Sequence, residues 1–137
     1  MNKIKLISLL AAAAVMTGSV AMAETYSATG NGYHGEMTVN VTIEDGKITD
    51  VDYDSMNADG TKKSEDQAYR ESMEPVSKTY PAKFYKELED QLSEKQDPKK
   101  VDAVTGATNS SNDFKILAVE AIKAAKAGTT DAVEVSK

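Results

Sequence analysis

The sequence has no cysteine and a single histidine, His34. Zinc ribbons, iron–sulfur clusters, thiol redox pairs and c-type haem attachment all need cysteine, so these classes of site are excluded. Catalytic triads that combine histidine with a cysteine or serine nucleophile are strongly disfavoured for the same lack of partners. Any redox chemistry in this chain must therefore use a bound cofactor.

Basic residues are also few, with 16 Lys and Arg against 22 Asp and Glu and a net charge of −6. An excess of acidic residues repels the phosphates of nucleic acid, so we expect no nucleic-acid partner. The same charge favours a soluble protein that self-repels, and we expect a monomer. No set of carboxylates has the spacing of a calcium loop or of a glycosidase pair, so we expect no metal site of that kind.

The one long apolar run lies at the N-terminus. Lys3 and Lys5 precede an apolar run at residues 6–16, and small residues follow at 17–23, ending in Ala-Met-Ala. This pattern predicts a secretory signal peptide, residues 1–23, with cleavage after Ala23. An uncleaved membrane anchor is the alternative, although the small polar residues break the run short of a span.

The predicted signal has consequences for location. It contains no twin arginine, which favours the general secretory route. Because the chain has no cysteine to carry a lipid, we expect a periplasmic or extracellular cell-envelope protein that is not lipid-anchored.

Residues 24–128 are predicted to form one small α+β domain, an antiparallel sheet with helices packed on one face, followed by a flexible tail at 129–137. Residues 37–43 alternate apolar and polar side chains, as in a half-buried strand. The dipeptide Asp45-Gly46 is typical of a type I′ turn, and residues 47–53 return as the second arm, with a bulge expected near Asp50. A short third strand is expected at 26–28, before a glycine-containing loop at 30–32.

Apolar residues at helical spacing predict three helices. The first spans about residues 64–75 and opens with a Ser-x-x-Gln capping box, and the second spans about 81–96. The third and longest is capped by Ser110 or Ser111 and ends at Gly128.

The segment Asp102–Ser111 carries the chemistry, between a short extended stretch at 101–104 and the third helix. Free backbone N–H groups and the helix dipole attract anions there, and Gly106 allows a ligand to approach the backbone closely. Hydroxyl groups that offer hydrogen bonds or an attachment point occur at Thr105, Thr108, Ser110 and Ser111. An ordinary glycine turn with a serine N-cap is the alternative, which local composition alone favours.

The run Asp-Ala-Val-Thr-Gly-Ala-Thr at 102–108 resembles the flavinylation motif D-x-x-[ST]-G-A-T of the FMN-binding domain family. That family includes peripheral subunits of sodium-pumping quinone reductases and extracellular electron-transfer flavoproteins. Residues 32–43 and 45–51 are similar to the opening hairpin of the family. The resemblance spans roughly residues 26–127.

The resemblance implies that Thr108 accepts FMN through a phosphoester bond. A separate Mg²⁺-dependent flavin transferase would make this bond from FAD and release AMP. Other cofactor-binding candidates are Asp102, Thr105, Gly106, Ala107, Ser110, Ser111, Tyr33 and His34. Of these, His34 is expected to contact the flavin or hold its turn rather than act in catalysis.

Aromatic and thioether side chains offer walls for a flat isoalloxazine ring. The candidates are Tyr33, Met56, Tyr80 and Tyr85, each of which could equally belong to the core. For Tyr85 we expect the core.

These inferences combine into an exported electron-transfer flavoprotein that relays electrons from a membrane donor to an extracytoplasmic acceptor. It is expected to be a carrier rather than a stand-alone enzyme. One alternative is a noncovalent FMN-binding sensor or carrier. Another is a flavin-free binding module of the envelope, in which Thr108 belongs only to a helix cap.

Overall fold

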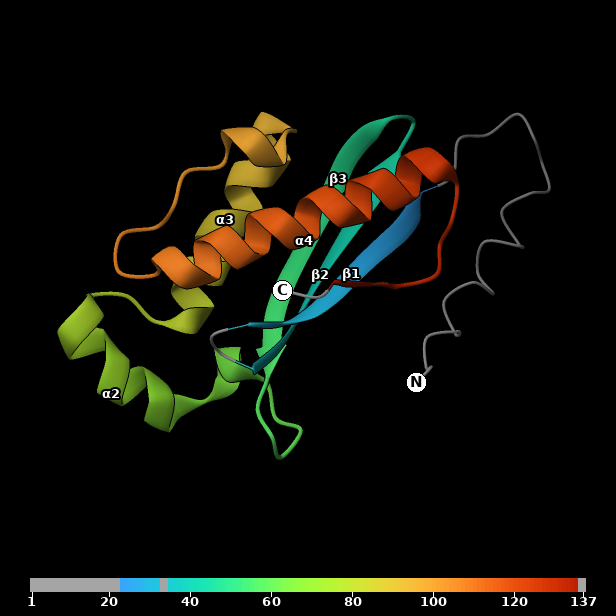
Figure 1. Cartoon of the computed structure of the whole chain (residues 1–137). Helices are drawn as coiled ribbons and strands as arrows, with labels where there is room; N and C mark the ends of the chain where they lie inside the picture. Colours follow the sequence, from blue (N-terminus) through green and yellow to red (C-terminus); the bar gives the residue numbers. More distant parts are fainter. Residues whose placement is uncertain (1–22, 33–34, 136–137) are drawn as a thin grey trace.

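A computed structural model describes residues 23–32 and 35–135 of the chain. Strands β1 (Glu24–Gly32), β2 (Gly35–Glu44), β3 (Lys47–Met56) and β4 (Val133–Val135) form a four-stranded sheet in the order β3-β2-β1-β4 (Figure 1). The first three strands are antiparallel, and β4 runs parallel to β1. The predicted signal peptide lies almost wholly outside the described residues.

The hairpin of β2 and β3 has the predicted turn and bulge. Asp45 and Gly46 have φ angles of 54° and 77°, as a type I′ turn requires. The register shifts between Thr42, which pairs with Asp50, and Ile43, which pairs with Ile48. The extra residue in β3 allows apolar positions of opposite parity to face the same core, so the bulge prediction is confirmed.

Two predictions about the edges of the domain are wrong. The expected loop at residues 30–32 is part of β1, because each of these residues has a register partner on β2. Within the expected tail, Val133–Val135 form β4 beside β1, and both valines pack partly buried against the core. A short apolar segment thus covers the second edge of β1, and the sheet is mixed rather than purely antiparallel.

Three helices, α2 (Gln67–Ser77), α3 (Pro81–Lys95) and α4 (Thr108–Ala127), accompany the sheet. Helix α4 lies across β1 and β2, and α3 lies against β3, which confirms the α+β class (Figure 1). In the ranges that the structure describes, no helix is both long and apolar enough to cross a bilayer.

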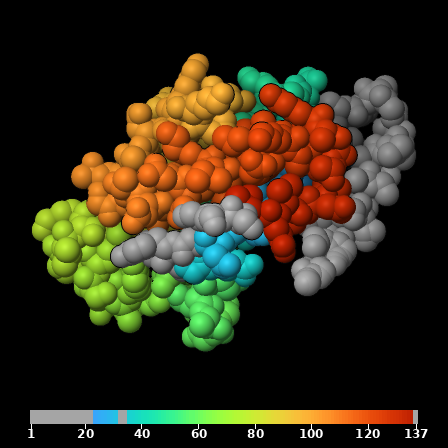
Figure 2. Space-filling view, in the orientation of Figure 1, coloured from blue at the N-terminus to red at the C-terminus, as the bar shows by residue number. Residues whose placement is uncertain are grey.

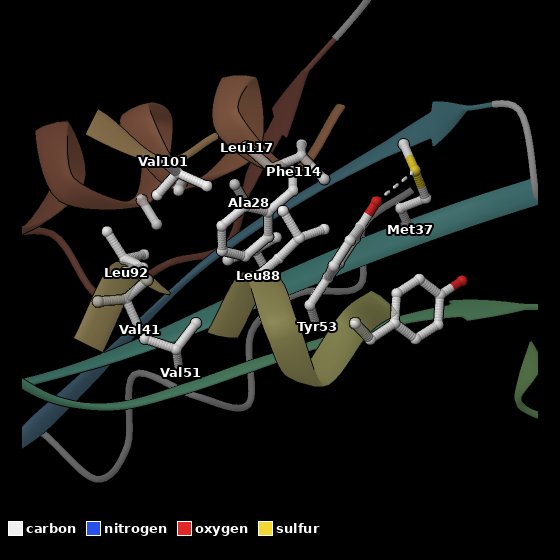
Figure 3. Close-up of a cluster of buried hydrophobic side chains, with 14 of the residues drawn as sticks. Ala28, Met37, Val41, Val51, Tyr53, Leu88, Leu92, Val101, Phe114 and Leu117 are labelled. Atoms are coloured by element: carbon white, nitrogen blue, oxygen red, sulfur yellow. Dashed lines mark hydrogen bonds between the residues drawn. The ribbon is translucent and has the colours of Figure 1, made fainter. Parts of the chain in front are cut away.

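The core lies between the sheet and helices α3 and α4 (Figure 3). Helix α3 contributes the predicted apolar positions Phe84, Leu88 and Leu92, all fully buried. Its C-cap residue Gln96 has a left-handed φ of 63° and closes the helix where the sequence predicted its end. Several of the largest buried residues appear in Figure 3: Met37, Val41, Tyr53, Leu88, Leu92, Phe114 and Leu117.

Helix α2 begins differently from the predicted capping box. Ser64 lies in a short 3₁₀ helix, η2 (Lys63–Glu65), and its hydroxyl donates to a carboxylate oxygen of Asp54. The N-cap is Asp66, whose carboxylate accepts from the backbone N–H of Tyr69 at 3.0 Å. Aspartate at this position satisfies a free helical donor as well as serine does, which explains the shifted start.

Candidate functional site: the turn that opens helix α4

The segment predicted to carry the chemistry forms a tight turn followed by the first residue of α4. The N–H of Ala107 donates to the carbonyl of Val104 at 2.9 Å, and Gly106 has a φ of 90°. Helix α4 begins at Thr108, with Ala107 as its N-cap. Residues 101–104 form no strand, so the short extended stretch expected there stays outside the sheet.

The two serines predicted as N-caps lie inside the first turn instead, and that prediction is wrong. Ser111 is fully buried, and its hydroxyl donates to the carbonyl of Ala107 at 2.7 Å and accepts from the N–H of Val104 at 2.9 Å. The Ser111 side chain therefore ties the turn to the helix. Helix α4 starts at Thr108, before both serines, so neither of them serves as its N-cap.

Gly106 packs tightly against the connection between α2 and α3. A Cβ atom at this position would lie 2.4 Å from the carbonyl oxygen of Ser77 and 3.2 Å from Cγ2 of Thr79. Both the positive φ and this contact require glycine. The loop is thus held close to a second segment, as the sequence could not show.

The first turn of α4 is open to an anion. No side-chain cap bonds its N-terminus, and the first N–H groups of any helix lack partners within it. Thr105 and Thr108 are both exposed, and Thr108 is the first helical residue, next to these donors. In Figure 2 the orange segment that contains the turn lies at the surface next to the green segment of α2. The arrangement suits a phosphate group.

Two buried hydroxyls next to this turn have no hydrogen-bond partner among the described residues. They are Oγ of Ser110, in the first turn of α4, and Oγ1 of Thr79, behind Gly106. The residues are 1% and 2% exposed. Buried polar atoms are nearly always paired, so these two indicate polar groups, such as water or a ligand, that complete the site.

Asp102 is held by its main chain and presents its side chain outward. Its N–H donates to Oε1 of Gln91 at 2.7 Å, and its carbonyl accepts from Nε2 of Gln91 at 3.0 Å. The carboxylate is 84% exposed and lies 3.3 Å from Nζ of Lys95. Gln91 was not predicted as a site residue, because nothing in its spacing distinguishes it from the other polar residues of α3.

An open groove of about 620 Å³ borders the turn. Val104 and Thr105 line one side, and the α2–α3 connection with part of α3 lines the other. Its remaining lining residues are Ser77, Lys78, Thr79, Lys83, Glu87, Asp90 and Gln91.

The structure brings together the predicted residues Thr105, Gly106, Ala107, Thr108, Ser110 and Ser111 in one turn and helix start, with Asp102 just before it. Tyr33 and His34 lie outside the described residues. The strand ends beside them approach α4, since Asn31 and Met37 line the same small cavity as Asp113 and Ile116.

The candidate ring-stacking residues separate in the structure. Tyr85 is 2% exposed and its hydroxyl donates to Oγ of Ser55 at 2.8 Å, so its assignment to the core is confirmed. Tyr80 is stacked by the guanidinium of Arg70, 3.7 Å from its ring centroid. Met56 is 43% exposed at the end of β3.

The fold and the turn together define an α+β domain whose longest helix begins without a side-chain cap directly after a glycine turn. The sequence model of the FMN-binding domain family matches residues 32–123. A "15 kDa lipoprotein" of Treponema pallidum (strain Nichols) is 39% identical over 69% of this chain and 67% of that protein. The crystal structure of the CPE2226 protein from Clostridium perfringens superposes with a TM-score of 0.78 and 38% identity, covering 82% of this chain and 95% of that one. The chain belongs to the FMN-binding domain family, which supports FMN as its cofactor.

The same comparison corrects the predicted localisation. We expected a protein without a lipid anchor, and that expectation is contradicted because the Treponema relative is named a lipoprotein. The absence of cysteine is a property of this chain alone and carries no information about its relatives.

Proposed function

We propose that the protein carries FMN covalently on Thr108, through a phosphoester bond, and relays electrons from a membrane donor to an extracytoplasmic acceptor. The observation that supports this most directly is the exposed Thr108 hydroxyl at the uncapped start of α4, directly after the Gly106 turn. The described residues fit a phosphate group, because they combine free helical donors with a glycine turn and unpartnered buried hydroxyls.

The attachment step requires a separate flavin transferase with FAD and Mg²⁺. Oγ1 of Thr108 forms a bond to the phosphorus of the FMN half of FAD, and the bond from that phosphorus to the AMP oxygen breaks. The hydroxyl proton is released, and AMP leaves. No electrons are exchanged in this step.

The chain's own residues position the attached phosphate. The first-turn N–H groups of α4 and the helix dipole stabilise its remaining negative charge by about 0.3–1 kcal/mol. Because Gly106 has no side chain, the turn can pack directly against the α2–α3 connection. Thr105 is also exposed but precedes Gly106, whereas Thr108 is the first helical residue and lies beside the free donors.

When bound, FMN supplies reversible one- or two-electron chemistry through its isoalloxazine ring. Attachment through the phosphate leaves that ring free, and the groove beside Thr105 is open to solvent. These features favour a monomeric carrier that meets its redox partners at its surface over an enzyme with an enclosed substrate pocket.

The test is to produce the full chain together with a flavin transferase and to record flavin fluorescence on a denaturing gel. Fluorescence should stay with the wild-type band, disappear in Thr108→Ala and remain in Asn109→Ala. Asn109 is the matched control, because it is an exposed first-turn neighbour outside the motif. Flavin that is lost on denaturation would indicate noncovalent binding, and a colourless native protein would indicate a flavin-free module; either result contradicts the proposal.

A further inference from the structure

Helix α3 holds the first residue of the motif by its main chain. Gln91 uses both ends of its amide, accepting from the N–H of Asp102 at 2.7 Å and donating to the carbonyl of Asp102 at 3.0 Å. A neighbouring β-strand would pair the backbone N–H and C=O groups of a residue in the same way. Residues 101–104 belong to no helix or strand, so this contact fixes Asp102 where regular structure does not.

Lys95, one turn further along α3, holds Gln91 in place. Its ammonium group donates to Oε1 of Gln91 at 3.2 Å and to the carbonyl of Lys100 at 3.0 Å. It also lies 3.3 Å from the Asp102 carboxylate. The acceptor end of the Gln91 amide is thereby kept toward the Asp102 N–H.

The fixed main chain contrasts with the free side chain of Asp102. The carboxylate is 84% exposed, and its one ion pair with Lys95 is too exposed to stabilise the fold much. Two hydrogen bonds hold the main chain of Asp102, while its carboxylate points outward. This arrangement suits a residue that another molecule contacts.

We propose that Gln91 is a positioning residue for flavin transfer, which holds Asp102 in the conformation that the flavin transferase binds. This inference rests on the proposed function. A preordered segment loses less conformational entropy when the transferase binds, so the effect of Gln91 falls on recognition. Lys95 contributes by orienting the Gln91 amide.

The chain offers a control at the C-cap of the same helix. Gln96 makes the same pair of bonds to Ile48, accepting from its N–H at 2.9 Å and donating to its carbonyl at 2.9 Å. Both glutamines are half-buried. Each variant therefore removes a pair of side-chain bonds to the main chain of one residue, at the motif for Gln91→Ala and at the β2–β3 hairpin for Gln96→Ala. Each also removes one bond near the end of α3, from Lys95 to Gln91 or from Gln96 to the carbonyl of Ser93.

The experiment measures the steady-state kinetics of a flavin transferase, with FAD and Mg²⁺, on full-length protein produced without flavin. For Gln91→Ala we expect the KM for the protein substrate to rise about tenfold with a smaller change in kcat, a fold-change typical of losing one good contact. Gln96→Ala should stay within about twofold of wild type. Urea unfolding of each variant gives the folded fraction, to which the rates are normalised.

Equal normalised kinetics for Gln91→Ala and Gln96→Ala would overturn the inference. Should Gln91→Ala not fold, Lys95→Met takes its place, and an unchanged KM in that variant would overturn the inference instead. Wild-type protein that accepts no flavin would overturn the proposed function as well, whereas labelled wild type with an unaffected Gln91→Ala would overturn only the role of Gln91.

Discussion

The hydroxyl of Tyr53 donates a 2.9 Å hydrogen bond to the main-chain carbonyl of Ser110, which joins β3 to the first turn of α4. The Tyr53 ring packs 4.6 Å from the Tyr85 ring and 5.0 Å from the Phe114 ring, measured between centroids. Figure 3 shows its hydroxyl directed toward Met37, whose sulfur lies 3.4 Å away. The start of α4 is thus anchored in the core by a residue far away in sequence.

Replacing Tyr53 by Phe keeps the ring and removes this anchor. We expect the free energy of unfolding to fall by about 1–2 kcal/mol, because a buried carbonyl loses a partner. Burial raises the pKa of Tyr53 above its ordinary value, so the hydroxyl stays protonated and the bond persists through ordinary alkaline buffers. Urea denaturation at neutral pH measures the loss, and an unchanged midpoint would contradict the anchoring role.

Substituting Gly106 by Ala should destabilise the fold by more than about 2 kcal/mol. The positive φ alone costs about 1–2 kcal/mol in a residue with a Cβ, and the contact with the carbonyl of Ser77 at 2.4 Å adds to it. Gly60→Ala is the control, because Gly60 has the same φ of 90° with nothing within 4 Å of the new Cβ. Equal losses in the two variants, measured by urea denaturation, would refute the close contact.

The carboxylate of Glu89 gives a pH dependence of stability. It accepts from the N–H of Tyr53 at 2.9 Å, and burial, with the nearby Asp52 charge, raises its pKa to about 7. Because this exceeds the unfolded value of about 4.3, the folded state binds the proton more tightly, and stability falls as pH rises from about 4.5 to 7. Glu89→Gln keeps an acceptor oxygen without the charge, so it should gain about 1–2 kcal/mol over wild type between pH 5 and pH 8.

Glu87→Gln provides the comparison for that titration. Its side chain is 41% exposed and pairs with Lys83 at 2.8 Å, so its loss should change stability little at any pH. Urea denaturation at half-unit pH steps resolves the three curves. Parallel curves for wild type and Glu89→Gln would show that Glu89 titrates normally.

Strand β4 should contribute measurably to stability. Ending the chain after Ala132 removes Val133–Val135, whose two valines pack partly buried on the core. We expect a loss of about 2 kcal/mol from the exposed apolar area and broken strand pairing. Thermal unfolding of the truncated protein tests this. An unaltered melting temperature would show that residues 133–135 contribute nothing to stability, as expected of the flexible tail that the sequence predicted.

The sequence predicted those features that neighbouring residues determine. Asp45-Gly46 specified the turn, the parity of the apolar residues in β3 specified the bulge, and the spacing in α3 specified its buried face. The motif located the candidate site because Gly106 and Thr108 lie only two positions apart in the chain. Local patterns failed at Ser64, because Asp66 caps α2 instead, and at the start of α4, because that helix begins at Thr108 without a side-chain cap.

Contacts between distant residues could not be predicted from one sequence. Gln91, Gln96 and Glu89 bind main-chain groups of other segments through their polar side chains. In the sequence each looks like an ordinary solvent-facing residue of α3 or its C-terminal end. The parallel pairing of β4 likewise depends on the chain returning to β1 after α4. These contacts arise from tertiary packing, which overrides local preference.

The central claim is tested most directly by the intact mass of the denatured protein after production with a flavin transferase. We predict an added mass equal to FMN minus one water, located by fragmentation on the peptide that contains Thr108 and absent from Thr108→Ala. An unmodified mass in the presence of an active transferase, or the same addition in Thr108→Ala, would contradict covalent attachment at this residue.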